Sequence, residues 1–309
     1  MKVIMGVMGQ TLSRDEITLL SHRGVSGVVL LGRNCSSLAA MRALIQDIKK
    51  INPDVRICLD HEGGRVMRIK DPSVMVPSSL SWDCPPTELC QRQLALKKAW
   101  AEPMRILKGV GIDMILGPCV DIHDAEQAVI GKLERSFSAN PEVVYGLAMA
   151  WLEVCREQGL ASCLKHWPGH GKACADSHID MAYDRRDRDA VMADAQIFVK
   201  LFAYADAVMP SHVIYESVCD QPASRSKLWV EMMRSAGFNG PIISDCFSMK
   251  GSGDISLKDK LSQAYDAGVT DFMHLHEDPR VLNDALDALY DHIEASNPDR
   301  VNLSHMAMR

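Results

Sequence analysis

Eight short apolar runs, rich in β-branched residues, alternate with longer segments of helical periodicity along this 309-residue chain. The runs are Val3–Val7, Gly27–Gly32, Arg56–His61, Asp113–Pro118, Ala161–His166, Ala207–Pro210, Pro241–Asp245 and Asp271–His274. The helical segments between them include Asp15–Arg23, Leu38–Lys50, Pro141–Gln158, Ala190–Ala205, Leu228–Ala236 and Lys258–Ala267. Such alternation is typical of parallel β/α units. A doubly wound sheet alternates in the same way as a closed barrel, so the count alone does not choose between them.

Polar residues at the ends of these runs indicate the closed form. They stand at or just after the carboxyl end of a run, at Asp60, Asp121, Lys165, His166, Ser211, His212, Asp245 and His274. In a closed barrel these ends meet on one face, where barrel enzymes carry their catalytic residues. We therefore predict an α/β fold, a single (β/α)8 TIM-type barrel, with residues 1–309 forming one catalytic domain. Barrels of this type have roughly 250 residues plus insertions, which fits the length.

Composition argues against several classes of function. The formal net charge is -6, and no run of Lys or Arg forms a basic patch of the kind that binds nucleic acid. No apolar run approaches the ~18 residues of a membrane span, and we interpret the short apolar start as a first strand rather than a signal peptide. The ten cysteines have no C-x-x-C spacing, so we expect free thiols and a cytoplasmic protein. The sequence leaves the oligomeric state open.

Titratable side chains are most concentrated between Lys165 and His178, where fourteen positions hold two Lys, three His and one Asp. The Pro168-Gly169 pair prevents a helix through this segment. His166 and His170 are four residues apart, as in helical metal sites, but without a helix they do not share a face, and the Glu of H-E-x-x-H is absent. We therefore predict a catalytic or binding loop without a metal.

Three motifs stand in order along the chain: Asp60–Arg68, Lys165–Gly171 with Asp176–His178, and Ser244–Met249. Together they resemble glycoside hydrolase family 3, and within it the bacterial cytoplasmic β-N-acetylglucosaminidases of peptidoglycan recycling. The resemblance implies a retaining hydrolase with Asp245 as nucleophile, His178 as acid/base and Asp176 as the partner of His178. It implies a sugar site formed by Asp60, Arg68, Arg135, Lys165 and His166. The implied substrate is a small carbohydrate, an N-acetylglucosaminyl-anhydromuropeptide or a related cell-wall fragment, and no cofactor is needed.

Elementary chemistry supports these roles but also allows simpler ones. Asp245 follows an apolar run that would bring a carboxylate to the barrel mouth, although an Asp there could also cap a turn. A histidine with an ordinary pKa of ~6.5 suits an acid that must later act as a base. Arg68 and Arg135 could instead be surface ion-pair residues. Glu62 is expected to brace the glycine turn that follows it.

One departure from the family pattern keeps two alternatives open. Cys246 follows the nucleophile where the family usually has a second Asp, which could alter the pKa or the orientation of Asp245. A catalytically weakened sugar-binding homologue is therefore one alternative. The other is a β-N-acetylglucosaminide phosphorylase, because a histidine acid/base does not repel phosphate as a carboxylate would.

Overall fold

The computed structural model describes residues 2–170, 172–173, 181–276 and 278–296. Two predicted catalytic residues, Asp176 and His178, lie outside these ranges. The strands are β1 (Lys2–Gly6), β2 (Val25–Leu30), β3 (Arg56–Leu59), β4 (His61–Gly63), β5 (Val66–Met67), β6 (Met114–Ile115), β7 (Ala161–Trp167), β8 (Ala182–Asp184), β9 (Ala207–Pro210), β10 (Val213–Tyr215) and β11 (Asp271–His274). The α-helices are α1 (Arg14–Leu20), α2 (Leu38–Ile51), α3 (Leu89–Val110), α4 (Pro141–Glu157), α5 (Arg188–Leu201), α6 (Lys227–Ser235), α7 (Leu257–Ala267) and α8 (Pro279–Ser296).

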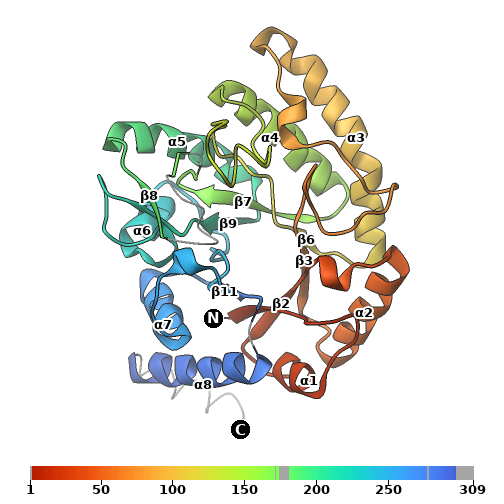
Figure 1. The fold of residues 1–309 in the computed structure, drawn as a ribbon, viewed down its shortest axis with the longest axis vertical. Coiled ribbons are helices and arrows are strands. Elements are labelled where there is room, and N and C mark those ends of the chain that lie inside the picture. The colour runs from red at the N-terminus through yellow and green to blue at the C-terminus, as the bar shows by residue number, and fades with distance from the viewer. Residues whose placement is uncertain (1, 171, 174–180, 277, 297–309) are drawn as a thin grey trace.

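Seven parallel strands form the central sheet, in the order β11-β1-β2-β3-β6-β7-β9. The helices lie around the outside of this sheet (Figure 1). Because side chains alternate between the faces of a strand, the sheet contributes to two apolar clusters. Val28 and Ile57 belong to the large cluster that also contains helix residues, whereas Val29 and Cys58 belong to a smaller cluster built mainly from strand residues. The sheet is therefore buried on both faces, as parallel sheets are.

The predicted closed eight-stranded barrel is wrong. The segment predicted as a strand from Pro241 makes only isolated parallel bridges, between Ile242 and Val208 and between Ile243 and Asp271. The cause is local hydrogen bonding. The Ile242 N–H donates to the Thr270 hydroxyl at 2.9 Å, and the Ile242 carbonyl accepts from the N–H groups of Thr270 and Asp271. The Asp271 N–H bond belongs to the bridge itself, but the Thr270 hydroxyl takes the Ile242 N–H that a longer ladder would need. Single bridges, not an eighth strand, therefore connect the two edges of the sheet.

Helix ends follow the capping signals of the sequence. Ser13 and Glu16 form a capping box: the Ser13 Oγ accepts from the Glu16 N–H, and the Glu16 carboxylate accepts from the Ser13 N–H. Asn140 caps α4, with Pro141 as its first residue. Gly268 ends α7 in the left-handed conformation, with φ +96°. Local chemistry therefore determines where these helices begin and end.

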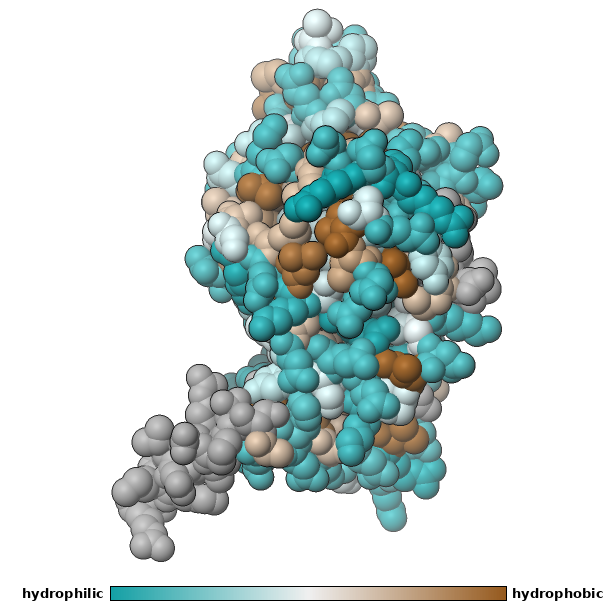
Figure 2. Space-filling model, turned by 90° about the vertical axis from the view of Figure 1, so that its left-hand side faces the viewer, coloured by the Kyte–Doolittle hydropathy of each residue, from teal (hydrophilic) through white to brown (hydrophobic). Residues whose placement is uncertain are grey.

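Apolar side chains on the face shown in Figure 2 occur in small groups among polar ones. Within the described residues, no helix combines the length and the apolar character needed to cross a bilayer.

Candidate active site

A cavity of about 440 Å³ is lined by residues at and beyond the carboxyl ends of several strands. Six of the predicted site residues line it together: Asp60, Arg68, Arg135, Lys165, His166 and Asp245. They come from segments far apart in the sequence, and parallel strands bring such segments to one edge. Apolar residues of the smaller cluster, among them Met209 and Met273, also line the cavity. The structure therefore gathers every predicted site residue that it describes.

Asp60 lies between two cations. Its Oδ1 is 3.0 Å from Lys165 Nζ, and its Oδ2 is 2.7 Å from Arg68 Nη2. Burial alone would raise the pKa of the Asp60 carboxyl, but the Lys165 ammonium and the Arg68 guanidinium outweigh this and hold the pKa well below its usual range. Asp60 is therefore a permanent carboxylate, able to accept hydrogen bonds from hydroxyl groups.

Glu62 connects two further members of the site. Its carboxylate pairs with the Arg135 guanidinium through two hydrogen bonds and lies 2.5 Å from Lys165 Nζ. The Glu62 side chain is only 2% exposed, and the Lys165 side chain 3%. Against a large desolvation cost, these two cations keep the pKa of Glu62 below normal. The carboxylate thus braces the cations of the site, whereas the sequence prediction had it brace the turn after it.

The turn after Glu62 needs its glycines for steric reasons. Gly63 has φ +95°, and a Cβ atom there would lie 2.1 Å from the Pro77 carbonyl oxygen. Gly64 has φ +57°, and its Cβ would lie 2.6 Å from the Ser78 Cβ. Both features disfavour any residue with a side chain. This close approach of the backbone sets the position at which Glu62 enters the site.

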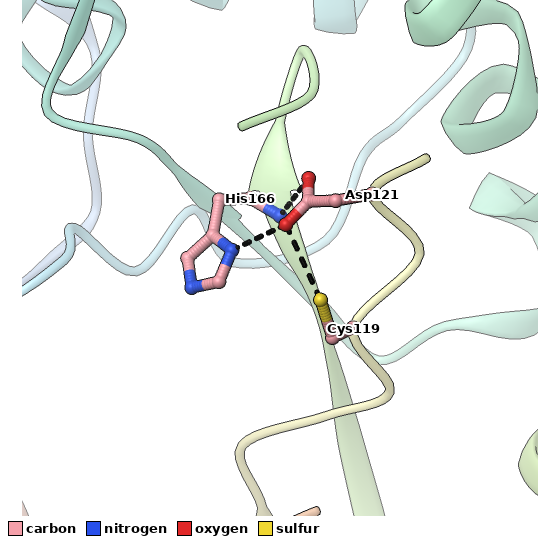
Figure 3. A group of neighbouring side chains, drawn as sticks. All are labelled: Cys119, Asp121 and His166. Atoms are coloured by element: carbon pink, nitrogen blue, oxygen red, sulfur yellow. Dashed lines mark hydrogen bonds and ion pairs between the residues drawn. The ribbon is translucent and has the colours of Figure 1, made fainter. Parts of the chain in front are cut away.

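Asp121 organises the start of the loop after β7. The side chains of Cys119 and His166 both point toward its carboxylate (Figure 3). The Asp121 Oδ2 accepts from His166 Nδ1 at 2.7 Å and from Cys119 Sγ at 3.2 Å. Its Oδ1 accepts from the backbone N–H groups of His166, at 3.1 Å, and His170, at 2.8 Å. One buried carboxylate therefore fixes both the His166 ring and the backbone of the turn up to His170.

The Cys119, Asp121 and His166 side chains could in principle hold a metal ion, since their ligand atoms lie within 4.8 Å of one another. The tautomer of His166 argues against this. Arg135 Nη2 lies 3.2 Å from His166 Nε2, and a guanidinium can only donate, so Nε2 carries no proton. In the neutral ring the proton is then on Nδ1, where it is donated to Asp121. The donor set thus fits a hydrogen-bonded group better than a metal site.

The backbone around Asp245 is firmly held. The Ser244 N–H donates to the Asp271 carbonyl at 2.9 Å, and the Cys246 N–H donates to Asp245 Oδ1 at 2.7 Å. The Cys246 thiol is buried and lies 2.8 Å from Ser248 Oγ. Burial raises the pKa of this thiol to about 11, so it stays protonated at neutral pH. Cys246 therefore orients Asp245 through its backbone N–H, which any residue type except proline supplies.

Comparison with known proteins identifies the family. The model of the glycosyl hydrolase family 3 N terminal domain matches residues 2–306. The chain belongs to glycosyl hydrolase family 3. This family 3 protein is 35% identical to a β-hexosaminidase of Pasteurella multocida (strain Pm70) over 273 residues, which cover 86% of this chain and 77% of that relative. It is 33% identical to a β-hexosaminidase of Methylobacillus flagellatus over 98% of this chain and 88% of that one.

A solved structure agrees with this assignment. The crystal structure of NagZ from Neisseria gonorrhoeae in complex with N-trifluoroacetyl-D-glucosamine matches with a TM-score of 0.83 and 30% identity. The match covers 92% of this chain and 84% of that one. The family 3 protein described here is therefore a glycoside hydrolase, as its motifs predict.

Two site residues of this hydrolase were absent from the sequence-based set. Glu62 is two positions after Asp60, and this spacing puts side chains on one face of an extended segment, a signal that could have found it. Asp121 stands after the carboxyl end of a predicted strand, but the sequence pattern assigns it no function. Its role depends on His166, 45 positions away in the sequence, a contact that no local pattern reveals.

Proposed function

We propose that this hydrolase removes terminal, non-reducing β-linked N-acetylglucosamine from peptidoglycan fragments, the anhydromuropeptides, with retention of configuration. The observation that carries the proposal is a single cavity lined both by Asp245 and by Asp60 with its two ion-pair partners, Arg68 and Lys165. A carboxylate beside fixed cations suits a pyranose, because each hydroxyl can both donate and accept. The names of the β-hexosaminidase relatives support the N-acetylhexosamine part.

In the proposed reaction, the Asp245 carboxylate attacks the anomeric carbon while the bond to the leaving oxygen breaks. His178 donates its proton to that oxygen, and Asp176 stabilises the imidazolium of the resting acid. Water then attacks the glycosyl-enzyme, His178 takes the proton of the water, and Asp245 is released. The net reaction consumes one water and leaves the enzyme unchanged, so it needs no cofactor.

The sugar would be held by Asp60, Arg68, Arg135, Lys165 and His166. Lys165 and Arg68 remain charged because Asp60 and Glu62 raise the pKa of both against the effect of burial, so each can donate to a hydroxyl throughout the physiological range. Arg135 and His166 already hydrogen-bond each other, so a substrate would meet them as one rigid wall.

The single-domain, cytoplasmic arrangement also belongs to the proposal. The family match over residues 2–306 supports one catalytic domain. All nine cysteines that the structure describes are free thiols, which supports a reducing compartment.

The direct test compares the wild type with Asp245→Asn and His178→Ala on an aryl β-N-acetylglucosaminide. Loss of the nucleophile should lower kcat by about 10⁴-fold or more. Asp54→Asn, at an exposed carboxylate before β3, is the control and should have wild-type kinetics. Full activity of Asp245→Asn would refute the mechanism.

The products decide between the chemical alternatives. The wild type should release free N-acetylglucosamine with and without phosphate, and NMR should find the β-anomer first. Sugar 1-phosphate in the presence of phosphate would instead identify a phosphorylase. Binding of N-acetylglucosamine without turnover would identify a weakened homologue.

A further inference from the structure

His212 is a fully buried histidine between the end of β9 and the segment that carries Asp245. Its ring packs against Phe247, with the ring centroids 5.4 Å apart and the planes at 30°. Neither the proposed sugar site nor the proposed proton transfer uses it.

Both ring nitrogens of His212 have defined partners. Nε2 lies 3.0 Å from the Cys246 carbonyl oxygen, and Nδ1 lies 2.6 Å from Ser224 Oγ. A carbonyl oxygen can only accept, so Nε2 carries the proton, and the Ser224 hydroxyl donates to Nδ1. Burial lowers the pKa of His212 to about 4, so the ring is neutral near pH 7 and keeps this tautomer. It cannot act as a general acid there.

The Cys246 backbone is thereby held at both ends. Its carbonyl accepts from His212 and also from the Met249 N–H at 3.0 Å. Its own N–H donates to Asp245 Oδ1 at 2.7 Å. A rotation of the Cys246 backbone would move that N–H away from the carboxylate, so fixing the carbonyl also fixes the orientation of Asp245.

We propose that His212 is a positioning residue for the nucleophile: its Nε2–H holds the Cys246 carbonyl, and the Cys246 N–H in turn holds the carboxylate of Asp245. This inference rests on the proposed role of Asp245. It explains how the nucleophile is oriented with Cys246 in place of the Asp usual in the family, because the orienting groups are the Cys246 backbone and an imidazole from another strand end. Such orientation matters because displacements of about 1 Å at a reacting group can cost on the order of 100-fold in rate.

Two variants of His212 and one control test the proposal. His212→Ala removes the donor, whereas His212→Gln can place an amide N–H near the position of Nε2. Leu44→Ala, a buried truncation on α2, controls for a loss of stability alone. The measurements are kcat and KM on an aryl β-N-acetylglucosaminide well below each Tm, and the rate at which a fluorinated glycosyl fluoride forms the covalent adduct, followed by intact mass.

We expect His212→Ala to lower kcat and the trapping rate together by about 10- to 100-fold with KM within about threefold of wild type. His212→Gln should recover most of the loss, and Leu44→Ala should lower Tm with kcat unchanged. A His212→Ala variant with wild-type kcat and trapping rate but a lower Tm would overturn the proposal, as would a His212→Gln variant as slow as His212→Ala. Failure of the nucleophile assignment is a separate outcome, since full activity of Asp245→Asn reveals it whatever the His212 variants do.

Discussion

Glu62 holds Arg135 through two parallel hydrogen bonds, 2.8 Å from Nε to Oε2 and 2.9 Å from Nη2 to Oε1. Such bidentate pairs fix geometry as well as charge. Glu62 also forms an ion pair with Lys165, and Arg135 also hydrogen-bonds His166. The Glu62–Arg135 pair therefore connects the carboxylates after β3 with the end of β7. The cavity wall is thus one continuous polar network, and each member depends on its neighbours for charge balance.

Glu62→Gln should therefore be costly although it preserves size. The change leaves Arg135 and Lys165 buried with one negative charge fewer, and breaking a buried ion pair from one side costs about 3–5 kcal/mol. We expect a loss of that order in the free energy of unfolding, measured in urea, and a higher KM on an aryl β-N-acetylglucosaminide. Glu157→Gln, at an exposed residue of α4, is the control and should change neither. Equal stability of both variants would contradict a role for Glu62 in the network.

Gly63→Ala tests the steric argument for the turn. A methyl group there would clash with the Pro77 carbonyl oxygen, and φ +95° is strained for alanine. We expect a loss of about 1–3 kcal/mol or more in the free energy of unfolding, with reduced kcat/KM because Glu62 is displaced. Gly109→Ala is the matched comparison: it lies in α3 with nothing within 4 Å of its Cβ, and it should stabilise the protein by about 0.5–1 kcal/mol. Similar effects of both substitutions would refute the steric account.

The sequence predicts the gathering of the site residues better than it predicts the strand pairing of the sheet. The convergence of Asp60, Lys165 and Asp245 followed from strand ends alone, since parallel strands end at one edge. The lack of an eighth strand could not be predicted in this way. It depends on the hydrogen bond from the Ile242 N–H to the Thr270 hydroxyl, a contact between residues 28 positions apart. Apolar β-branched residues predict an extended segment but not which hydrogen bonds it makes.

Helix α3 is not among the helical segments named from the sequence. Its 22 residues contain Pro103, which in sequence indicates a break. Packing against α4 lets the helix continue through it, and the Trp100 and Trp151 rings of the two helices meet edge to face at 5.7 Å. Tertiary packing here overrides a local preference.

Asp121→Asn and Cys119→Ala together test whether Asp121 is a hydrogen-bonding centre or a metal ligand. An Asn would turn one acceptor into a donor that faces His166 Nδ1–H or the backbone N–H groups, so kcat/KM should fall by about 10- to 100-fold. Cys119→Ala removes only a weak thiol donor and should stay within about threefold of wild type. Prolonged dialysis against a chelator should leave wild-type activity unchanged. Activity lost to the chelator and to Cys119→Ala alike would restore the metal interpretation.

Stability should fall with acid before the carboxylates are protonated, because of buried histidines. Burial lowers the pKa of His170 and His212 to about 4, against ~6.5 in an unfolded chain. Above pH 6.5 neither the folded nor the unfolded state binds these protons, so the two rings do not make the free energy of unfolding depend on pH. Between about pH 6.5 and 4 only the unfolded chain binds them, and the free energy of unfolding should fall by about 1.4 kcal/mol per pH unit for each ring.

His212→Gln isolates one of these contributions. Removing the imidazole should reduce the slope of unfolding free energy against pH by about 1.4 kcal/mol per unit between pH 6 and 5, whatever the variant does to stability at pH 7. Urea unfolding at pH 7, 6 and 5 measures this, with Leu44→Ala, which changes no titrating group, as the control that keeps the wild-type slope. Below about pH 4 the lowered pKa values of Asp60 and Asp121 add a further loss in both proteins, since their carboxylates stabilise the fold only while ionised. An unchanged slope in His212→Gln would mean that the folded protein protonates His212 as readily as the unfolded chain does, which the burial of the ring opposes.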